Sequence, residues 1–141
     1  MKILHVGVHD NKNKNSGDTV LFEMVRRAFD AMSAEEIIWK KRQIWAPITQ
    51  EDVQDINTLY DAIIIGGGGL LLRDQKGADA SKSGWQWNCS VKNLKAIRTP
   101  IVVFAIGYNR FRGQPDFLTV FDKHISTLIE KSIFFSLRNN G

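Results

Sequence analysis

Two side chains near the amino terminus can handle protons, His9 and Asp18. An imidazole can act as an acid or a base near neutral pH, and a carboxylate can accept hydrogen bonds from substrate hydroxyls or orient a reacting hydroxyl. His9 comes directly after an apolar run (residues 2–8), and Asp18 closes the polar segment HDNKNKNSGD (residues 9–18). These two residues are the candidate catalytic groups of the chain.

Asp18 also has a purely structural explanation. Asn15 or Ser16 can cap a helix that begins here, and a carboxylate in the first turn of a helix is stabilised by the helix dipole. Asn15 and Gly17 are also candidate substrate-binding residues, although Asp18 would repel a phosphate placed at this point. Both explanations of Asp18 stay open on the sequence.

Four consecutive glycines, Gly66 to Gly69, come at the end of the apolar run AIIIG (residues 62–66). Glycine after a buried strand indicates a tight turn or a close approach of another molecule. A P-loop needs Lys and then Ser or Thr after its last glycine, whereas leucines follow here, and the dinucleotide pattern G-x-G-x-x-G fails in both registers. The four glycines are therefore candidate substrate-binding residues outside the classical NAD and ATP motifs.

Polar segments also follow the last two apolar runs. Gly107, Tyr108 and Asn109 follow IVVFAI, and Arg138 follows IFFSL. Arginine binds planar anions in bidentate fashion, so arginines in these segments could hold a carboxylate or a phosphate. The alternative is that each is a solvated loop charge. The arginines concerned are Arg73, Arg110, Arg112 and Arg138.

Apolar runs alternate with amphipathic segments along the whole chain. The pattern predicts strands at residues 2–8, 36–40, 62–66, 101–107 and 133–137, and helices at 17–32, 50–59, near 86–97 and from Pro115 onward. This alternation is typical of an α/β fold, a Rossmann-like doubly wound parallel sheet of about five strands, in one domain over residues 1–141. Ligands of such sheets bind at the carboxyl ends of the strands, where all four polar segments should meet.

The two long helices carry apolar residues at helical spacing. In the second, Pro115 is expected at the first helical position. The stripe predicted to face the core in the first helix is Val20, Leu21, Met24, Val25, Ala28, Phe29 and Met32.

Composition limits the classes of protein. The chain has 141 residues, a net charge of +4 and one cysteine, Cys89, which excludes an internal disulfide and fits a reducing, cytoplasmic setting. No metal-ligand spacing, signal peptide or membrane-spanning run is present, so we expect a soluble protein without a metal. The cluster Lys40-Lys41-Arg42 is explained by an edge strand guarded by cations or by a nucleic-acid patch.

The sequence leaves the role of two tryptophans open. Trp85 and Trp87 could stack on a sugar or pack in the core, and His124 lies on the apolar side of its helix as a boundary residue. Cys89 has no obvious base near it in sequence, which argues against a nucleophile.

The chain resembles the amino-terminal half of the polysaccharide pyruvyl transferases. The resemblance is carried, in order, by four motifs. They are NSGD (15–18), DAIIIGGGGLL (61–71), TPIVVFAIG (99–107) and SLR (136–138). It implies one half of a two-domain protein of the GT-B type, whose carboxyl-terminal domain is absent from this chain. The family's glycine-rich lead-in to the first motif is replaced here by DNKNKN.

The resemblance also implies a function. Such enzymes transfer a pyruvyl group from phosphoenolpyruvate to sugar hydroxyls, forming a ketal in exopolysaccharide or cell-surface polysaccharide. It implies no cofactor beyond this donor, a saccharide or lipid-linked saccharide acceptor, no nucleic acid, and a cytoplasmic place at the inner face of the membrane. The motif positions are Asn15, Gly17, Asp18, Gly66, Gly67, Gly68, Gly69, Gly107 and Arg138.

Two other functions fit the same residues. One is a nucleotide-sugar glycosyltransferase of the GT-B type, and the other is a non-catalytic Rossmann-like binding module. If the chain is half of a pyruvyl transferase, the 141 residues alone are expected to be nearly inactive and to self-associate through their last strand.

Overall fold

The computed structural model describes residues 1–9, 16–73, 79, 81–108 and 112–138. Its centre is a five-stranded sheet with the order β2-β1-β3-β4-β5, in which every neighbouring pair is parallel. The strands are β1 (Lys2–Gly7), β2 (Ile38–Gln43), β3 (Ala62–Leu71), β4 (Ile101–Tyr108) and β5 (Ser132–Leu137).

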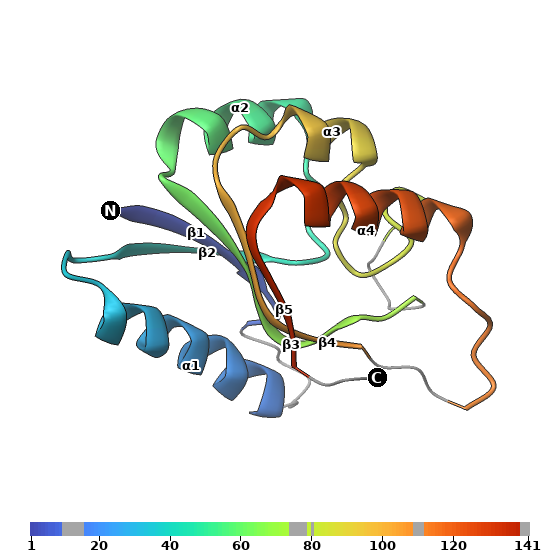
Figure 1. Ribbon diagram of the computed structural model, residues 1–141, viewed down its shortest axis with the longest axis horizontal. Helices are drawn as coiled ribbons and strands as arrows, with labels where there is room; N and C mark the ends of the chain where they lie inside the picture. The colour runs from blue at the N-terminus through green and yellow to red at the C-terminus, as the bar shows by residue number, and fades with distance from the viewer. Residues whose placement is uncertain (10–15, 74–78, 80, 109–111, 139–141) are drawn as a thin grey trace.

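Helices cover both faces of this sheet. They are α1 (Ser16–Met32), α2 (Gln50–Leu59), α3 (Val91–Ala96) and α4 (Thr119–Lys131). Figure 1 shows α2, α3 and α4 on one face and α1 alone on the other. The predicted α/β, Rossmann-like doubly wound parallel sheet is therefore confirmed. None of the helices in the described ranges is long and apolar enough to cross a membrane.

The two faces carry separate cores because side chains alternate along each strand. Leu4 and Ile63 belong to the larger core under α2, α3 and α4, whereas Ile3, Val25 and Ile64 form a smaller core under α1. Strands β1 and β3 lie inside the sheet and are buried on both faces, which explains their nearly continuous apolar sequences.

The sheet has its topological switch point between β1 and β3. The chain leaves β1 for β2 through α1, and leaves β2 for β3 through α2 on the opposite face. The pairing of the two strands ends at Val6 with Ile65, although β3 continues to Leu71. In sheets of this order, ligands bind in the crevice at the carboxyl ends of these two strands.

Several predicted boundaries are wrong. β3 extends past residue 66 to Leu71, so Gly66–Gly69 lie inside the strand; it stays paired with β4 through a register shift between Gly68 and Leu71. β2 begins at Ile38, two residues later than predicted. The helix predicted near 86–97 is only the short α3, because its capping residue is Ser90.

The start of the last helix was also misplaced. α4 begins at Thr119, so Pro115 lies outside the helix and is not its first residue. A proline fits a helix start but also an extended connection, and here the second holds.

The predicted buried stripe of α1 is partly right, since Val25 and Phe29 do face the core. Val20, Met24 and Met32 are exposed, whereas Phe22, which that stripe left out, is fully buried. The buried face is formed by Phe22 and Val25 with Phe29 beside them. Both faces of this helix carry apolar residues, so spacing alone did not decide which one meets the sheet.

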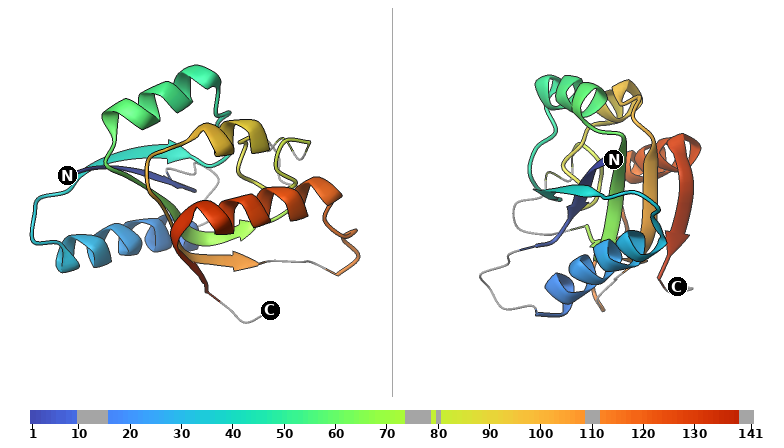
Figure 2. Two further views of the ribbon diagram at one scale, coloured as in Figure 1. Left: turned by 45° about the horizontal axis from the view of Figure 1, so that its top comes forward. Right: turned by 90° about the vertical axis from the view of Figure 1, so that its left-hand side faces the viewer.

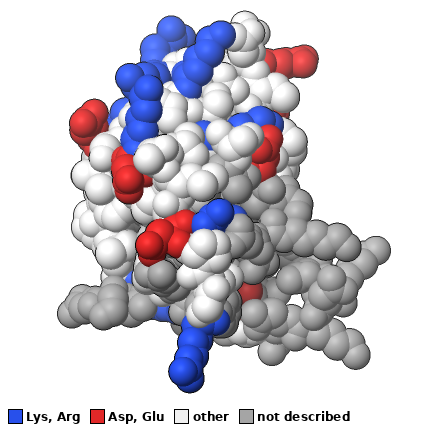
Figure 3. Space-filling view, turned by 90° about the vertical axis from the view of Figure 1, so that its right-hand side faces the viewer, with Lys and Arg blue, Asp and Glu red and all other residues white. Residues whose placement is uncertain are grey.

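The two edges of the sheet differ in charge. β2 carries Lys40, Lys41 and Arg42, and it is an edge strand as the cation-guard explanation requires. Lys41 Nζ lies 2.9 Å from Glu23 Oε1, and an Arg42 side-chain nitrogen lies 3.0 Å from Asp52 Oδ1. On the side of the molecule drawn in Figure 3, basic and acidic side chains are interspersed over the described surface.

The other edge, β5, carries no charged residue. The right-hand view of Figure 2 shows β5 in red at one margin of the sheet. Ile133 is 72% exposed, and Phe134 and Leu137 are each 50% exposed. An uncharged, apolar edge strand is a template for pairing with another chain.

We expect the chain to self-associate through β5. Ile133→Lys places a charge on this edge and should shift the protein to monomer in sedimentation velocity, as edge lysines do in natural sheets. Ile38→Lys on the opposite edge, where Ile38 is 55% exposed, is the matched control and should leave association unchanged. A wild-type chain that stays monomeric at high concentration would contradict the prediction.

Candidate functional site

The first turns of α1 pack directly on the glycine run. Gly67 has φ +84°, and a Cβ atom built on it would lie 2.9 Å from Phe22 Cα and 3.0 Å from the Leu21 carbonyl oxygen. Real Cβ atoms do not approach main chain this closely, and this φ favours glycine. A glycine at position 67 therefore lets the helix backbone lie against the end of β3.

Asp18 lies over the next glycine. A Cβ atom on Gly68, whose φ is +156°, would lie 3.2 Å from Asp18 Oδ1. Asp18 is also the acidic residue in the first turn of α1, one turn before Phe22, so it occupies the same side of the helix. The structural and the functional explanation of Asp18 are thus compatible. Its carboxylate lies in the first turn of α1, where the helix dipole stabilises it, and it also lies over the glycine run.

A guanidinium lies against Gly107 of β4, next to this run. A Cβ atom on Gly107 would lie 2.9 Å from Arg138 Nη2 and 3.1 Å from Gly69 Cα. The Arg138 main-chain N–H donates to the Ile106 carbonyl at 2.9 Å, which extends the pairing of β5 with β4. Glycine at 107 therefore leaves room for the Arg138 side chain at the carboxyl end of β4.

His9 lies just beyond the end of β1. Its main-chain N–H donates to Gln43 Oε1 at 3.3 Å, and the Gln43 side-chain amide donates back to the His9 carbonyl. Its ring is half-buried and lies 5.1 Å from the ring of Phe22, centroid to centroid. His9 and Asp18 thus border the same aromatic residue of α1.

His5 is not among the residues predicted from the sequence, although it lies beside the first glycine of the run. His5 is fully buried on β1, and its Nε2 lies 3.2 Å from the Gly66 carbonyl oxygen. Burial lowers its pKa to about 3, so the ring is neutral at pH 7. The signal was a histidine inside an apolar strand, two residues before the strand's terminal glycine.

The remaining predicted site residues are less informative. Asn15 and Asn109 lie outside the described residues, as do the side chain of Ser16 and Arg110. Gly17 is exposed in the first turn of α1, and Tyr108 ends β4 with its ring 5.9 Å from that of Phe117.

The other two described arginines that were predicted, Arg73 and Arg112, have different surroundings. Arg73 Nη1 donates to the Asp116 carbonyl oxygen, which joins the end of β3 to the segment before α4. Arg112 is exposed, as a solvated loop charge would be. Of the described arginines that were predicted, Arg138 is the one that lies against Gly107, next to Gly69.

The tryptophans belong to the core. Trp85 and Trp87 are 0% and 1% exposed, which leaves no surface for stacking on a sugar. Trp85 Nε1–H donates to His124 Nδ1 at 3.1 Å, and His124 is fully buried, not a boundary residue. Burial also raises the pKa of the Cys89 thiol to about 12, so it is not a thiolate at neutral pH.

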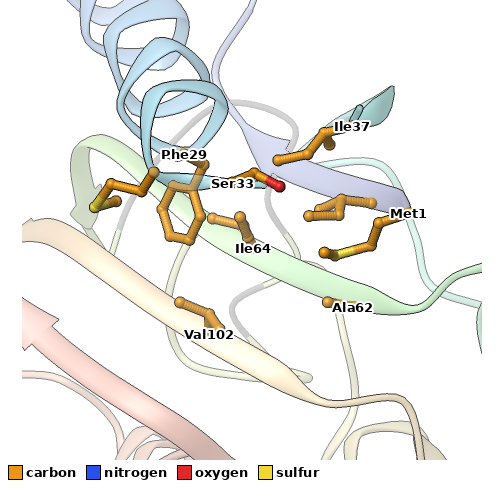
Figure 4. Close-up of a pocket in the computed structure, with 9 residues that line it drawn as sticks. Met1, Phe29, Ser33, Ile37, Ala62, Ile64 and Val102 are labelled. Atoms are coloured by element: carbon orange, nitrogen blue, oxygen red, sulfur yellow. The ribbon is translucent and has the colours of Figure 1, made fainter. Parts of the chain in front are cut away.

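An apolar cavity of about 330 Å³ lies at the amino ends of the strands, opposite the candidate site. It sits between the last turns of α1 and the amino ends of β1, β3 and β4, and Figure 4 shows the side chains around it. Ser33 is its polar lining residue, and Ser33 Oγ donates to the Glu35 carbonyl. This cavity suits apolar groups and not an anionic or sugar substrate. The lining residues are Met1, Ile3, Phe29, Met32, Ser33, Ile37, Ala62, Ile64 and Val102.

Comparison of this chain with protein-family models, with curated proteins and with solved structures found no match. Over the described ranges, no three His, Cys, Asp or Glu side chains are grouped so as to hold a metal ion. The candidate site thus lies at the carboxyl ends of β3 and β4, where Asp18 lies over Gly68 and Arg138 lies against Gly107, next to Gly69. Such a site can orient a hydroxyl and bind an anion.

Proposed function

We propose that this chain forms one wall of a sugar pyruvyl transferase site, at which a pyruvyl group passes from phosphoenolpyruvate to hydroxyls of a saccharide. The observation that carries the proposal is the placement of one carboxylate over Gly68 and of one guanidinium against Gly107, which lies next to Gly69. The ordered motifs of the sequence support it, since one residue of each motif takes part in these contacts, namely Asp18, Gly68, Gly107 and Arg138.

The chemistry needs both kinds of group. Protonation of the donor's methylene carbon leaves a cationic centre at C2, a sugar hydroxyl attacks C2, and the phosphate leaves with the electrons of its C–O bond. A second hydroxyl of the same sugar then closes the ketal and releases its proton. Arg138 supplies a planar cation for the donor's carboxylate or phosphate, and Asp18 orients a hydroxyl and accepts its proton.

The acceptor is a saccharide or lipid-linked saccharide, and the protein works in the cytoplasm at the inner face of the membrane, which it reaches through that acceptor. His9 is the second candidate for proton transfer. Its ring lies 5.1 Å from the ring of Phe22, which follows Asp18 by one turn of α1.

Arg138→Gln is expected to weaken phosphoenolpyruvate binding by at least about tenfold, because a charge-assisted hydrogen bond to the anion is lost. Isothermal titration calorimetry on the chain measures this. Arg112→Gln removes the same charge from an exposed loop position and should change the affinity by less than about twofold. Binding of UDP-glucose with no binding of phosphoenolpyruvate would overturn the proposal in favour of a glycosyltransferase.

A further inference from the structure

His5 joins three elements at the floor of the crevice. It lies on β1, its Nε2 is 3.2 Å from the Gly66 carbonyl oxygen on β3, and its ring stacks on Phe22 of α1. The two ring centroids are 3.7 Å apart and the planes differ by 5°. A buried polar ring in this position holds all three elements by one hydrogen bond and one stacked contact.

The hydrogen bond falls where the sheet opens. Val6 and Ile65 are the last paired residues of β1 and β3, so Gly66 is the first residue of β3 beyond that pairing. A buried carbonyl at this point needs a donor, and the His5 ring supplies it. Because a carbonyl oxygen can only accept, the proton is on Nε2 and Nδ1 carries the lone pair.

The stacked contact leads to Asp18. Phe22 follows Asp18 by four residues, so the two side chains lie one above the other on α1. The ring of Phe22 stacks on His5 and also lies against Gly7, where a Cβ atom would lie 2.8 Å from Phe22 Cδ2. The main chain of Phe22 lies against Gly67, where a Cβ atom would lie 2.9 Å from Phe22 Cα. A shift of Phe22 therefore moves the first turn of α1, and with it the Asp18 carboxylate, relative to Gly68.

Charged groups surround His5 at the level of α1. Arg26 and Glu23 of α1 and the imidazole of His9 act on its ring, with effects of opposite sign and smaller than that of burial. Lys41 of β2 lies over the other aromatic ring, with Nζ 5.8 Å from the Phe22 centroid. The neutral His5 ring thus stacks on an aromatic ring, and charged side chains lie near both rings.

We propose that His5 is a positioning residue of this site, which sets the distance between the Asp18 carboxylate and the glycine run through the Gly66 carbonyl and the Phe22 ring. It touches no substrate and donates no proton to one. The inference rests on the proposed function for its consequence in catalysis, but the positioning itself is a property of the fold. Nothing in the apolar pattern of β1 requires a histidine at this point, since an aliphatic side chain would fill the same core position.

The test compares His5→Phe with Ile3→Ala. Phenylalanine keeps a ring against Phe22 but leaves the Gly66 carbonyl without its donor. Ile3 is equally buried, on the same strand and under the same helix, but at the amino end. In amide ¹H–¹⁵N spectra, His5→Phe should shift the Gly66–Gly68 and Asp18 signals, whereas Ile3→Ala should leave them in place. Phosphoenolpyruvate affinity should fall about tenfold in the first variant and less than about twofold in the second.

Two further measurements guard against a misfolded variant. Phe22→Leu removes the stacked ring from the helix side and should shift the same amide signals. The wild-type imidazole spectrum at pH 7 should show a slowly exchanging proton on Nε2 and none on Nδ1. A proton on Nδ1, or equal shifts in Ile3→Ala and His5→Phe, would overturn the positioning role. A wild-type chain that binds no phosphoenolpyruvate would refute the proposed function alone, because the amide shifts still decide the role of His5.

Discussion

Acidification from pH 7 to pH 5 should lower the free energy of unfolding by about 4 kcal/mol, about 2 kcal/mol from each of two buried histidines. His5 and His124 are both fully buried. Burial lowers the pKa of His5 to about 3 and that of His124 to about 4, from an ordinary value of 6.5. The loss is large beside the 5–15 kcal/mol that is roughly typical of a folded domain.

The direction follows from where protons bind. Below pH 6.5 the unfolded chain protonates both histidines, while the folded chain keeps them neutral, so protons favour the unfolded state. The stabilisation is complete above pH 6.5 and is lost as the pH falls, down to about 4 for His124 and about 3 for His5. Smaller effects from Arg26 and Glu23 act on His5, and the Cys89 carbonyl opposes the lowering at His124.

Urea denaturation at pH 7, 6 and 5 measures this dependence. Stopping at pH 5 leaves carboxyl groups out of the window, since the Lys41 ammonium holds the pKa of Glu23 below its usual range. His124→Gln keeps an oxygen that can accept from the Trp85 indole N–H, and it should remove about half of the pH dependence. His5→Phe should remove the other half. An unchanged slope in both variants would show that these rings are not buried neutral.

Much of the fold was predictable because burial on both faces leaves a clear mark on a strand. β1, β3 and β4 read as apolar runs of β-branched and aromatic residues, and the intervening helices have polar faces. The burial of Phe22 by α1 was not predictable in this way. The buried face of α1 holds Phe22 on the same side of the helix as the charged Asp18. A carboxylate on one face of a helix normally indicates that this face meets solvent, so the pattern did not point to Phe22.

The site was predictable in place but not in detail. Polar segments after parallel strands meet at one end of the sheet, where Asp18 lies over Gly68 and Arg138 lies against Gly107, next to Gly69. The role of the glycines could not be read from the run itself. Gly67 makes room for helix backbone and Gly68 for a carboxylate, and such contacts join residues nearly fifty positions apart.

His5 marks the limit of this kind of prediction. Its side chain is polar, but its neighbours in sequence are those of a core position, so the sequence does not show which acceptor it meets. The Gly66 carbonyl becomes available to it only because β1 and β3 stop pairing after Val6 and Ile65. That divergence depends on the whole sheet and not on either strand.

Gly67→Ala is expected to reduce the free energy of unfolding by about 3–5 kcal/mol. Two costs combine in it. The backbone conformation at φ +84° is strained for alanine, by roughly 1–2 kcal/mol. In addition, the new methyl group would lie 2.9 Å from Phe22 Cα, and main chain of a helix cannot yield as the tip of a side chain can.

Gly113→Ala separates these two costs. Gly113 has nearly the same φ, +87°, but no described atom lies within 4 Å of a Cβ built there. This control should therefore lose only the conformational part, about 1–2 kcal/mol. Urea denaturation of both variants gives the difference, which is the contribution of close packing between β3 and α1. Equal losses at the two positions would mean that α1 moves away from β3 with little resistance. In that case the Asp18 carboxylate is not held against the glycine run, and Gly67→Ala should still bind phosphoenolpyruvate as the wild-type chain does.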